Sequence, residues 1–102
     1  MSVLMNFAMF PTDKGESVSQ YVSKVIKQIR RAGYTSQLTA MGTLVETETL
    51  HEAAALIEDA YKVLEEDCER VYVTINLDIR KGKIGRIDSK IRSIEDKLEG
   101  KD

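Results

Sequence analysis

The sequence predicts an α+β fold: one four-stranded antiparallel sheet, two helices on one of its faces, and a third helix near the C-terminus. Apolar residues switch between the strand period of two and the helix period near 3.6, in the order β-α-β-β-α-β-α. The chain has 102 residues, the size of one domain with one two-layer core. Its composition, 42% hydrophobic and 31% charged, is that of an ordinary globular protein. We therefore expect residues 1–102 to form a single domain.

The first strand and helix follow from residues 3–33. Residues 3–10 form a short apolar run that ends at Pro11, which predicts a strand buried on most of both faces and hence central in the sheet. Ser17 and Gln20 have the spacing of a capping box, which predicts a helix start. This helix ends before Gly33 and has one apolar face, made of Val18, Val22, Val25, Ile26 and Ile29.

A hairpin and a second helix are predicted next. Residues 34–39 and 43–47 are rich in β-formers, and the short segment 40–42 permits a tight turn, with Leu38 and Val45 directed toward the core. A second capping box starts at residue 49 of the segment Thr49-Leu-His-Glu52. The helix that it begins has an apolar stripe, made of Leu50, Ala53, Ile57, Ala60, Tyr61 and Leu64, which Ala54 and Leu56 widen.

The last strand and helix complete the order. In residues 70–79, apolar and polar side chains alternate strictly, so one face of this strand is predicted to be core and the other polar. A helix over residues 84–99 has a stripe made of Ile84, Ile87, Ile91, Ile94 and Leu98. The first six elements fit a split βαβ, ferredoxin-like sandwich. Because two helices already cover one sheet face, the last stripe lies either on the edge of its own sheet or on a second subunit. We expect the latter, an oligomer contact.

Charge and rare residues exclude several classes of protein. The net charge of −2 disfavours a nucleic-acid-binding domain. One cysteine, Cys68, and one histidine, His51, exclude an intrachain disulfide and zinc sites of the Cys₄ or Cys₂His₂ kind. The first apolar run is too short for a signal peptide, and no run is long enough to span a membrane. We therefore expect a cytoplasmic protein without a membrane or nucleic-acid partner.

The sheet face opposite the two helices is expected to be open. Its middle is predicted to hold amide and hydroxyl side chains, which form hydrogen bonds when partly buried. Such a face is either solvated or an oligomer interface, and a ligand pocket is compatible with both. The predicted strip comprises Asn6, Gln37, Glu46, Thr74 and Asn76 beside Leu4, Phe10, Leu44 and Tyr72.

Few residues indicate catalysis or metal binding. His51 lies at a predicted helix start, and Cys68 lies among acids whose charge would raise the pKa of its thiol. Residues 65–69 lack the glycine-bearing pattern of a calcium loop, so we predict no catalytic or metal site.

Two charged features remain open from the residues alone. Glu46 lies inside a predicted strand, where a half-buried carboxylate needs a donor, either Arg70, Arg80 or a ligand amine. The second is a basic cluster before the last helix, which either binds phosphate or is a solvated turn. This cluster comprises Arg80, Lys81, Lys83 and Arg86.

Four segments in series carry a resemblance to a known family. They are Ser-Val-Ser-Gln-Tyr-Val at residues 17–22, Met-Gly-Thr-Leu-Val-Glu at 41–46, Arg-Val-Tyr-Val-Thr at 70–74 and Asp-Ile-Arg-Lys at 78–81. In order and spacing the chain resembles the small thiamine-binding protein family. The resemblance implies a ferredoxin-like fold assembled into dimers or tetramers. It also implies binding of thiamine or its hydroxymethylpyrimidine moiety without catalysis or a cofactor. The family's glycine-rich segment after the first strand is here Pro-Thr-Asp-Lys-Gly at residues 11–15, with the glycine displaced.

The ligand that the resemblance implies suggests which side chains to examine. An aminopyrimidine offers a donor amine, ring-nitrogen acceptors and a flat face, so amides, carboxylates and an aromatic or methionine wall would suit it. Two alternatives stay open: a ferredoxin-like dimeric monooxygenase, and a structural or regulatory assembly domain without a small ligand. The expected ligand-binding residues are Asn6, Tyr21, Met41, Thr43, Glu46 and Asn76.

Overall fold

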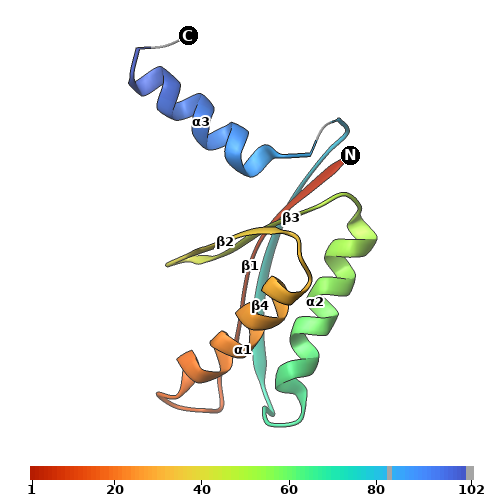
Figure 1. Cartoon of the computed structure of the whole chain (residues 1–102). Helices are drawn as coiled ribbons and strands as arrows, with labels where there is room; N and C mark the ends of the chain where they lie inside the picture. Colours follow the sequence, from red (N-terminus) through yellow and green to blue (C-terminus); the bar gives the residue numbers. More distant parts are fainter. Residues whose placement is uncertain (83, 101–102) are drawn as a thin grey trace.

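The predicted order of elements is confirmed by the computed structural model, which describes residues 1–82 and 84–100 (Figure 1). Each element lies within about two residues of its predicted bounds. The elements are β1 (Ser2–Pro11), α1 (Val18–Arg31), β2 (Thr35–Thr39), β3 (Gly42–Thr47), α2 (Leu50–Glu65), β4 (Val71–Arg80) and α3 (Arg86–Leu98).

The four strands form one antiparallel sheet in the order β2-β3-β1-β4, so β1 is central as predicted. Helices α1 and α2 pack against each other and on one face of this sheet (Figure 1). This is the ferredoxin-like arrangement, and it leaves the opposite face of the sheet without either helix. We refer to that opposite side as the open face.

The core lies between the sheet and the two helices. Alternate residues of β1, namely Val3, Met5, Phe7 and Met9, are buried there against the inner sides of α1 and α2. The same alternation directs Leu4, Asn6, Ala8 and Phe10 to the open face, as predicted.

Two parts of the predicted core are wrong. Leu38 lies on the helix side of β2 but is 55% exposed. On β4, Ile75, Leu77 and Ile79 lie on the helix side but are 40–49% exposed. The physical reason is that β2 and β4 are edge strands, whereas α1 and α2 lie mainly over β1 and β3.

One of the two predicted capping boxes is confirmed and the other is wrong. The Thr49 hydroxyl accepts from the Glu52 N–H, and the Glu52 carboxylate accepts from the Thr49 N–H. Ser17, in contrast, makes no side-chain capping bond. Its backbone (φ −85°, ψ 23°) lacks the extended conformation that aims a capping side chain at the first turn.

Helix α3 extends away from the rest of the molecule (Figure 1). It begins at Arg86, contacts β1 and β3 near its start, and buries Ile87. Its apolar stripe then becomes steadily more exposed: Ile91 is 41% exposed, Ile94 61% and Leu98 81%. Among the described residues, no helix is long and apolar enough to cross a membrane.

The two helix starts give a matched test of capping. Thr49→Ala should lower the free energy of unfolding by about 1 kcal/mol, because it removes a capping bond. Ser17→Ala should change it by less than about 0.5 kcal/mol, because no such bond is lost. Urea denaturation monitored by circular dichroism measures both values. Equal losses in the two variants would contradict the assignment.

Candidate functional site

The centre of the open face brings together two of the predicted ligand-binding residues. Asn6 of β1 lies directly opposite Asn76 of β4 on one side and Leu44 of β3 on the other. Paired residues of an antiparallel sheet project from the same face, so the two amides are neighbours. The sequence prediction placed both on this face, and the register puts them side by side.

A small hollow of about 180 Å³ lies at these amides. Its walls combine the two amides with aliphatic side chains and one ion pair, between Asp78 of β4 and Lys90 of α3. The residues lining it include Leu4, Asn6, Leu44, Asn76, Asp78 and Lys90. Binding pockets for small ligands usually enclose about 300–1,000 Å³. The hollow in one chain is therefore an incomplete pocket.

The side-chain amides of Asn6 and Asn76 are free to bind. In the part of the chain that the structure describes, neither amide makes a hydrogen bond. Asn6 also lies close to Gly42, where an added Cβ would come within 2.7 Å of the Asn6 Oδ1. The absence of a side chain at Gly42 thus leaves room for the Asn6 amide. Each amide offers both donors and an acceptor to a ligand on this face.

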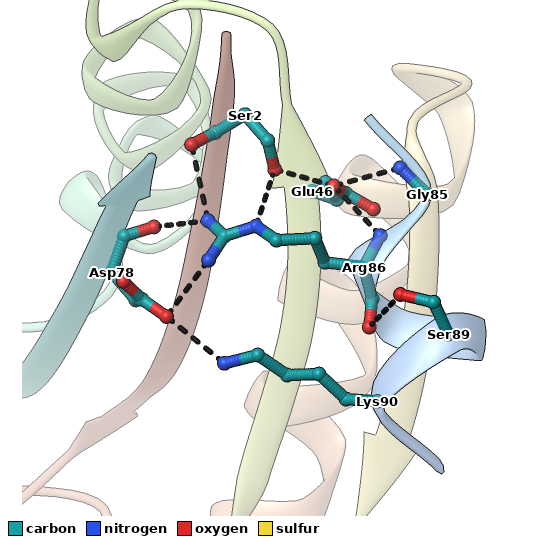
Figure 2. Close-up of polar contacts among 7 residues, drawn as sticks. All are labelled: Ser2, Glu46, Asp78, Gly85, Arg86, Ser89 and Lys90. Carbon is teal, nitrogen blue, oxygen red and sulfur yellow. Dashed lines mark hydrogen bonds and ion pairs between the residues drawn. The ribbon is translucent and has the colours of Figure 1, made fainter. Parts of the chain in front are cut away.

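Glu46, the third predicted residue on the open face, is buried and held by the protein itself (Figure 2). Its Oε2 accepts from the Ser2 hydroxyl, from the Gly85 N–H at 2.9 Å and from the Arg86 N–H at 3.1 Å. The predicted partners were Arg70, Arg80 or a ligand amine, and the first two are wrong. Glu46 instead satisfies the first free N–H groups of α3, as a capping side chain does.

Arg86 also holds the start of α3 on the sheet, and its residue is 5% exposed. Its Nε donates to the Ser2 hydroxyl at 2.9 Å, and its Nη1 donates to the Asp78 carboxylate at 2.8 Å. Its Nη2 donates to the backbone carbonyls of Ser2 and Asp78. Lys90 adds a second cation at 3.0 Å from Asp78 (Figure 2). We call Ser2, Glu46, Asp78, Arg86 and Lys90 the α3 anchor.

Both carboxylates of the α3 anchor are stabilised in the ionised form. Burial opposes ionisation of Glu46, but hydrogen bonds from Ser2, Arg86 and Gly85 hold its pKa below the usual value. The hydrogen bond from Lys90, and then the Arg86 guanidinium, lower the pKa of Asp78, while desolvation opposes them. The other Glu46 oxygen, Oε1, is buried and has no hydrogen-bond partner among the described residues.

The phosphate hypothesis for the basic cluster loses support from these contacts. Arg86 is engaged inside the α3 anchor, and the N–H groups at the helix start already bind the Glu46 carboxylate. The place that an anion would take at the start of α3 is therefore occupied by a side chain. Arg80 and Lys81 are exposed, and Lys83 lies outside the described residues.

The other three predicted residues lie elsewhere. Thr43 pairs with Phe7 and so faces the helices, where it and Met41 line a mostly apolar cavity of about 310 Å³ between α1, β1 and the hairpin. Tyr21 lies on α1, with the ammonium of Lys24 5.2 Å from its ring centre. These residues and the two asparagines therefore do not form one site.

The residues excluded from catalysis by sequence lie apart from the open face. His51 is exposed in the first turn of α2, which covers the opposite face. Cys68 is buried, and burial together with nearby Asp13 raises the pKa of its thiol. The sequence predicts the direction of this pKa shift from the neighbouring acids, but it does not predict the burial. Among the described residues, no group of three His, Cys, Asp or Glu side chains is placed to hold a metal ion.

Sequence reasoning missed the roles of Ser2 and Arg86. Ser2 carries no local signal, because its role depends on strand pairing that joins residues more than forty positions apart. Arg86 stood out as part of a basic cluster, but a positive charge in the first turn of a helix interacts unfavourably with the helix dipole. That mismatch was the available sign that Arg86 has a tertiary partner.

These features define a ferredoxin-like α+β domain with a partly open, amide-bearing sheet face. A family model described as "Thiamine-binding protein" matches residues 5–95. The chain therefore belongs to the thiamine-binding protein family, as its resemblance implied. A UPF0045 protein of Mycobacterium bovis is 32% identical over 95 residues, which is 93% of each chain. A UPF0045 protein of Methanocaldococcus jannaschii is 32% identical over 92 residues, covering 90% of this chain and 91% of that one.

Solved structures share this fold. The crystal structure of a hypothetical protein of M. jannaschii has a TM-score of 0.79 and 33% identity, covering 92% of this chain and 96% of that one. A Thermotoga maritima protein, described as a candidate thiamine biosynthesis or salvage protein, has a TM-score of 0.81. At 19% identity, over 92% of this chain and 99% of that one, it supports the fold alone.

The α3 anchor should contribute strongly to stability. Arg86→Ala should lower the free energy of unfolding by about 2–4 kcal/mol, since it leaves the buried acceptors on Ser2 and the part-buried carbonyl of Asp78 without their donor. Arg92→Ala, at an exposed position of the same helix, should cost less than about 0.5 kcal/mol. Urea denaturation of both variants measures the difference, and similar losses would contradict the role of Arg86.

The anchor should weaken in acid. Because the pKa values of Glu46 and Asp78 are lowered on folding, their contribution is complete above the ordinary values of 4.5 and 3.8. It should be lost as the pH falls through the lower values of the folded protein. The amide resonances of Gly85 and Arg86, followed by NMR, should titrate with a midpoint below 4.5.

Two controls accompany the titration. Glu46→Gln should abolish the shift of both amides, because the ionising oxygen is removed. The Gly33 amide, which donates to the Arg30 carbonyl, should stay unchanged over the same range. A midpoint above 4.5 would show that burial, rather than hydrogen bonding, controls Glu46.

Proposed function

We propose that this protein binds thiamine or its hydroxymethylpyrimidine moiety on the open face, without catalysis, as a homo-oligomer in the cytoplasm. Family membership supports a thiamine-related small molecule as the ligand. The observation that carries the proposal is the pair of unpartnered amides, Asn6 and Asn76, side by side in a hollow of the open face.

The chemistry of the hollow matches an aminopyrimidine. A ring amine needs an acceptor and the ring nitrogens need donors, and two amides supply both. Leu4 and Leu44 offer apolar contact to the flat ring. Phe10 and Tyr72 form an aromatic boundary further along the open face, with their ring centres 5.7 Å apart. They lie four residues from Asn6 and Asn76 along the same two strands. In our proposal the two asparagines are the primary ligand contacts.

We propose Thr43, Met41 and Tyr21 only as secondary candidates for ligand contact. Met41 and Thr43 line a cavity whose wall is mainly apolar, which suits a ring but offers few groups to orient it. Glu46 acts on the ligand through α3, because its carboxylate is already engaged by Ser2, Gly85 and Arg86. It is therefore proposed as a positioning residue.

Self-association is supported by the incomplete pocket and by α3. A hollow of about 180 Å³ needs a further wall to enclose a drug-sized ligand. The exposed stripe of Ile91, Ile94 and Leu98 is costly to leave in water, at about 0.8 kcal/mol per CH₂ group. We propose that α3 packs on a neighbouring subunit and that assembly completes the pocket.

Titration calorimetry tests the proposed site directly. Ligand-free protein is titrated with thiamine, hydroxymethylpyrimidine and thiamine phosphate in parallel. At least one should bind saturably, and Asn6→Ala and Asn76→Ala should each weaken it about tenfold by removing a ligand hydrogen bond. Thr74→Ala, on the same strand and face but outside the hollow, is the matched control and should bind as the wild type.

Three outcomes would contradict the proposal. Absence of heat with all three compounds, from folded oligomer, would reject the ligand and favour an assembly domain. Binding that Asn6→Ala and Asn76→Ala leave unchanged, but Met41→Ala weakens, would move the site to the cavity between α1 and the hairpin. Consumption of the bound compound would favour an enzyme.

A further inference from the structure

The basic residues of α1 lie in a part of the chain that has no acidic residue. Residues 17–45 contain no aspartate or glutamate, although the whole chain has 17 such residues. The same segment contains four cations, so it is positively charged within a protein whose net charge is −2. These cations are Lys24, Lys27, Arg30 and Arg31. Clefts lined by charges of one sign concentrate ligands of the opposite sign.

Three of the four cations have no ionic partner in the part of the chain that the structure describes. Lys24 pairs with Asp67 at 3.8 Å, whereas the side chains of the other three are exposed and make no ion pair or hydrogen bond among the described residues. We call Lys27, Arg30 and Arg31 the basic end of α1. Cations in the last turn of a helix interact favourably with its dipole, but that effect requires no apolar surface beside them.

An apolar groove of about 620 Å³ lies beside the basic end, between α1 and β2. Its apolar floor consists of Val22 and Ile26, which are half-buried, and Leu38 of β2, which is 55% exposed. Among the described residues, no acidic side chain lines this groove. Its volume lies in the range of about 300–1,000 Å³ that is usual for small-molecule sites.

Charge and apolar surface are separated along the groove. The cations lie within residues 27–31, whereas the apolar floor extends back along α1 to Val22. At a rise of 1.5 Å per residue, residues 22 and 30 are about 12 Å apart along the helix axis. The three floor residues also line the cavity of about 310 Å³ between α1, β1 and the hairpin, so the groove continues into apolar space.

We propose that this groove binds an amphipathic anion, with the anionic head at the basic end of α1 and an unbranched alkyl chain on the apolar floor. Guanidinium groups bind carboxylate and phosphate oxygens through paired hydrogen bonds, and the lysine adds a third positive charge. An exposed ion pair alone contributes little, so covering the apolar floor supplies the larger part of the affinity. A membrane surface or an acidic helix would match charges spread along α1. Their confinement to one end favours a single head group.

This groove is separate from the ligand site proposed on the open face. Leu38 lies on the helix side of the sheet, whereas Asn6 and Asn76 project from the opposite side. The two sites can therefore be tested independently, and the inference does not require that the protein bind thiamine.

An NMR titration with decanoate, kept below the concentration at which it forms micelles, tests the groove. The extended chain of decanoate has about the length of the apolar floor. Saturable shifts are expected for the backbone amides of Ile26, Arg30 and Leu38, but not for that of Asn76 on the open face. Acetate, which lacks the chain, and decanol, which lacks the charge, should each bind about tenfold more weakly or not at all.

Substitutions separate the two parts of the site. Arg30→Gln and Arg31→Gln should each weaken decanoate binding about fivefold, because each removes one exposed charge-assisted contact. Leu38→Gln should weaken it about tenfold, because it places an amide in the apolar floor. Arg92→Gln and Ile94→Gln, at exposed positions of α3, are the matched controls and should bind as the wild type. Circular dichroism should be unchanged in all five variants, since each substituted side chain is exposed.

Three results would overturn this inference. One is the absence of saturable shifts at the groove, and another is shifts at Ile94 of similar affinity, which would show unspecific adsorption to exposed apolar side chains. The third is binding to phosphatidylserine vesicles that Arg30→Gln and Arg31→Gln weaken, without any binding of decanoate, which would make the basic end a contact for membrane surfaces. Because no thiamine is added, these failures would leave the proposed function on the open face unaffected.

Discussion

The hydrogen bonds of Glu46, Ser2 and Arg86 hold the C-terminal part of this molecule on the sheet. A carboxylate buried in β3 accepts the first N–H groups of α3, and a guanidinium from α3 joins β1 to β4 through Ser2 and Asp78. Each buried charge has hydrogen-bond partners, as a water-poor site requires. Without these contacts α3 would retain few links to the domain, because Ile87 is the one residue of its apolar stripe that it buries.

The α3 anchor also determines where the open face ends on one side. Helix α3 covers one end of that face, the ring pair of Phe10 and Tyr72 stands toward the other, and the amides of Asn6 and Asn76 lie between them. Lys90 belongs to both the anchor and the wall of the hollow. A change in how α3 is held would therefore alter the shape of the proposed ligand site, although Glu46 itself does not face a ligand.

Three surfaces remain incomplete in a single chain: the hollow on the open face, the outer edge of β4 and the apolar stripe of α3. The first lacks an enclosing wall, the second lacks a pairing strand, and the third lacks a packing partner. In the proposed oligomer, α3 contacts a neighbouring subunit. Ligand binding and assembly would in this way depend on each other, in keeping with the incomplete pocket of one chain.

The local pattern of the sequence determined the order of the elements, the central position of β1, the capping of α2 by Thr49 and the face on which Asn6, Asn76 and Glu46 lie. These follow from periodicity and from contacts within a few residues. Tertiary structure decided the partners of Glu46, the burial of Cys68, the separation of Tyr21, Met41 and Thr43 from the asparagines, and the exposure of Leu38 and Ile75. The physical reason is that strand alternation specifies a face, whereas burial and hydrogen bonding depend on which distant elements cover that face.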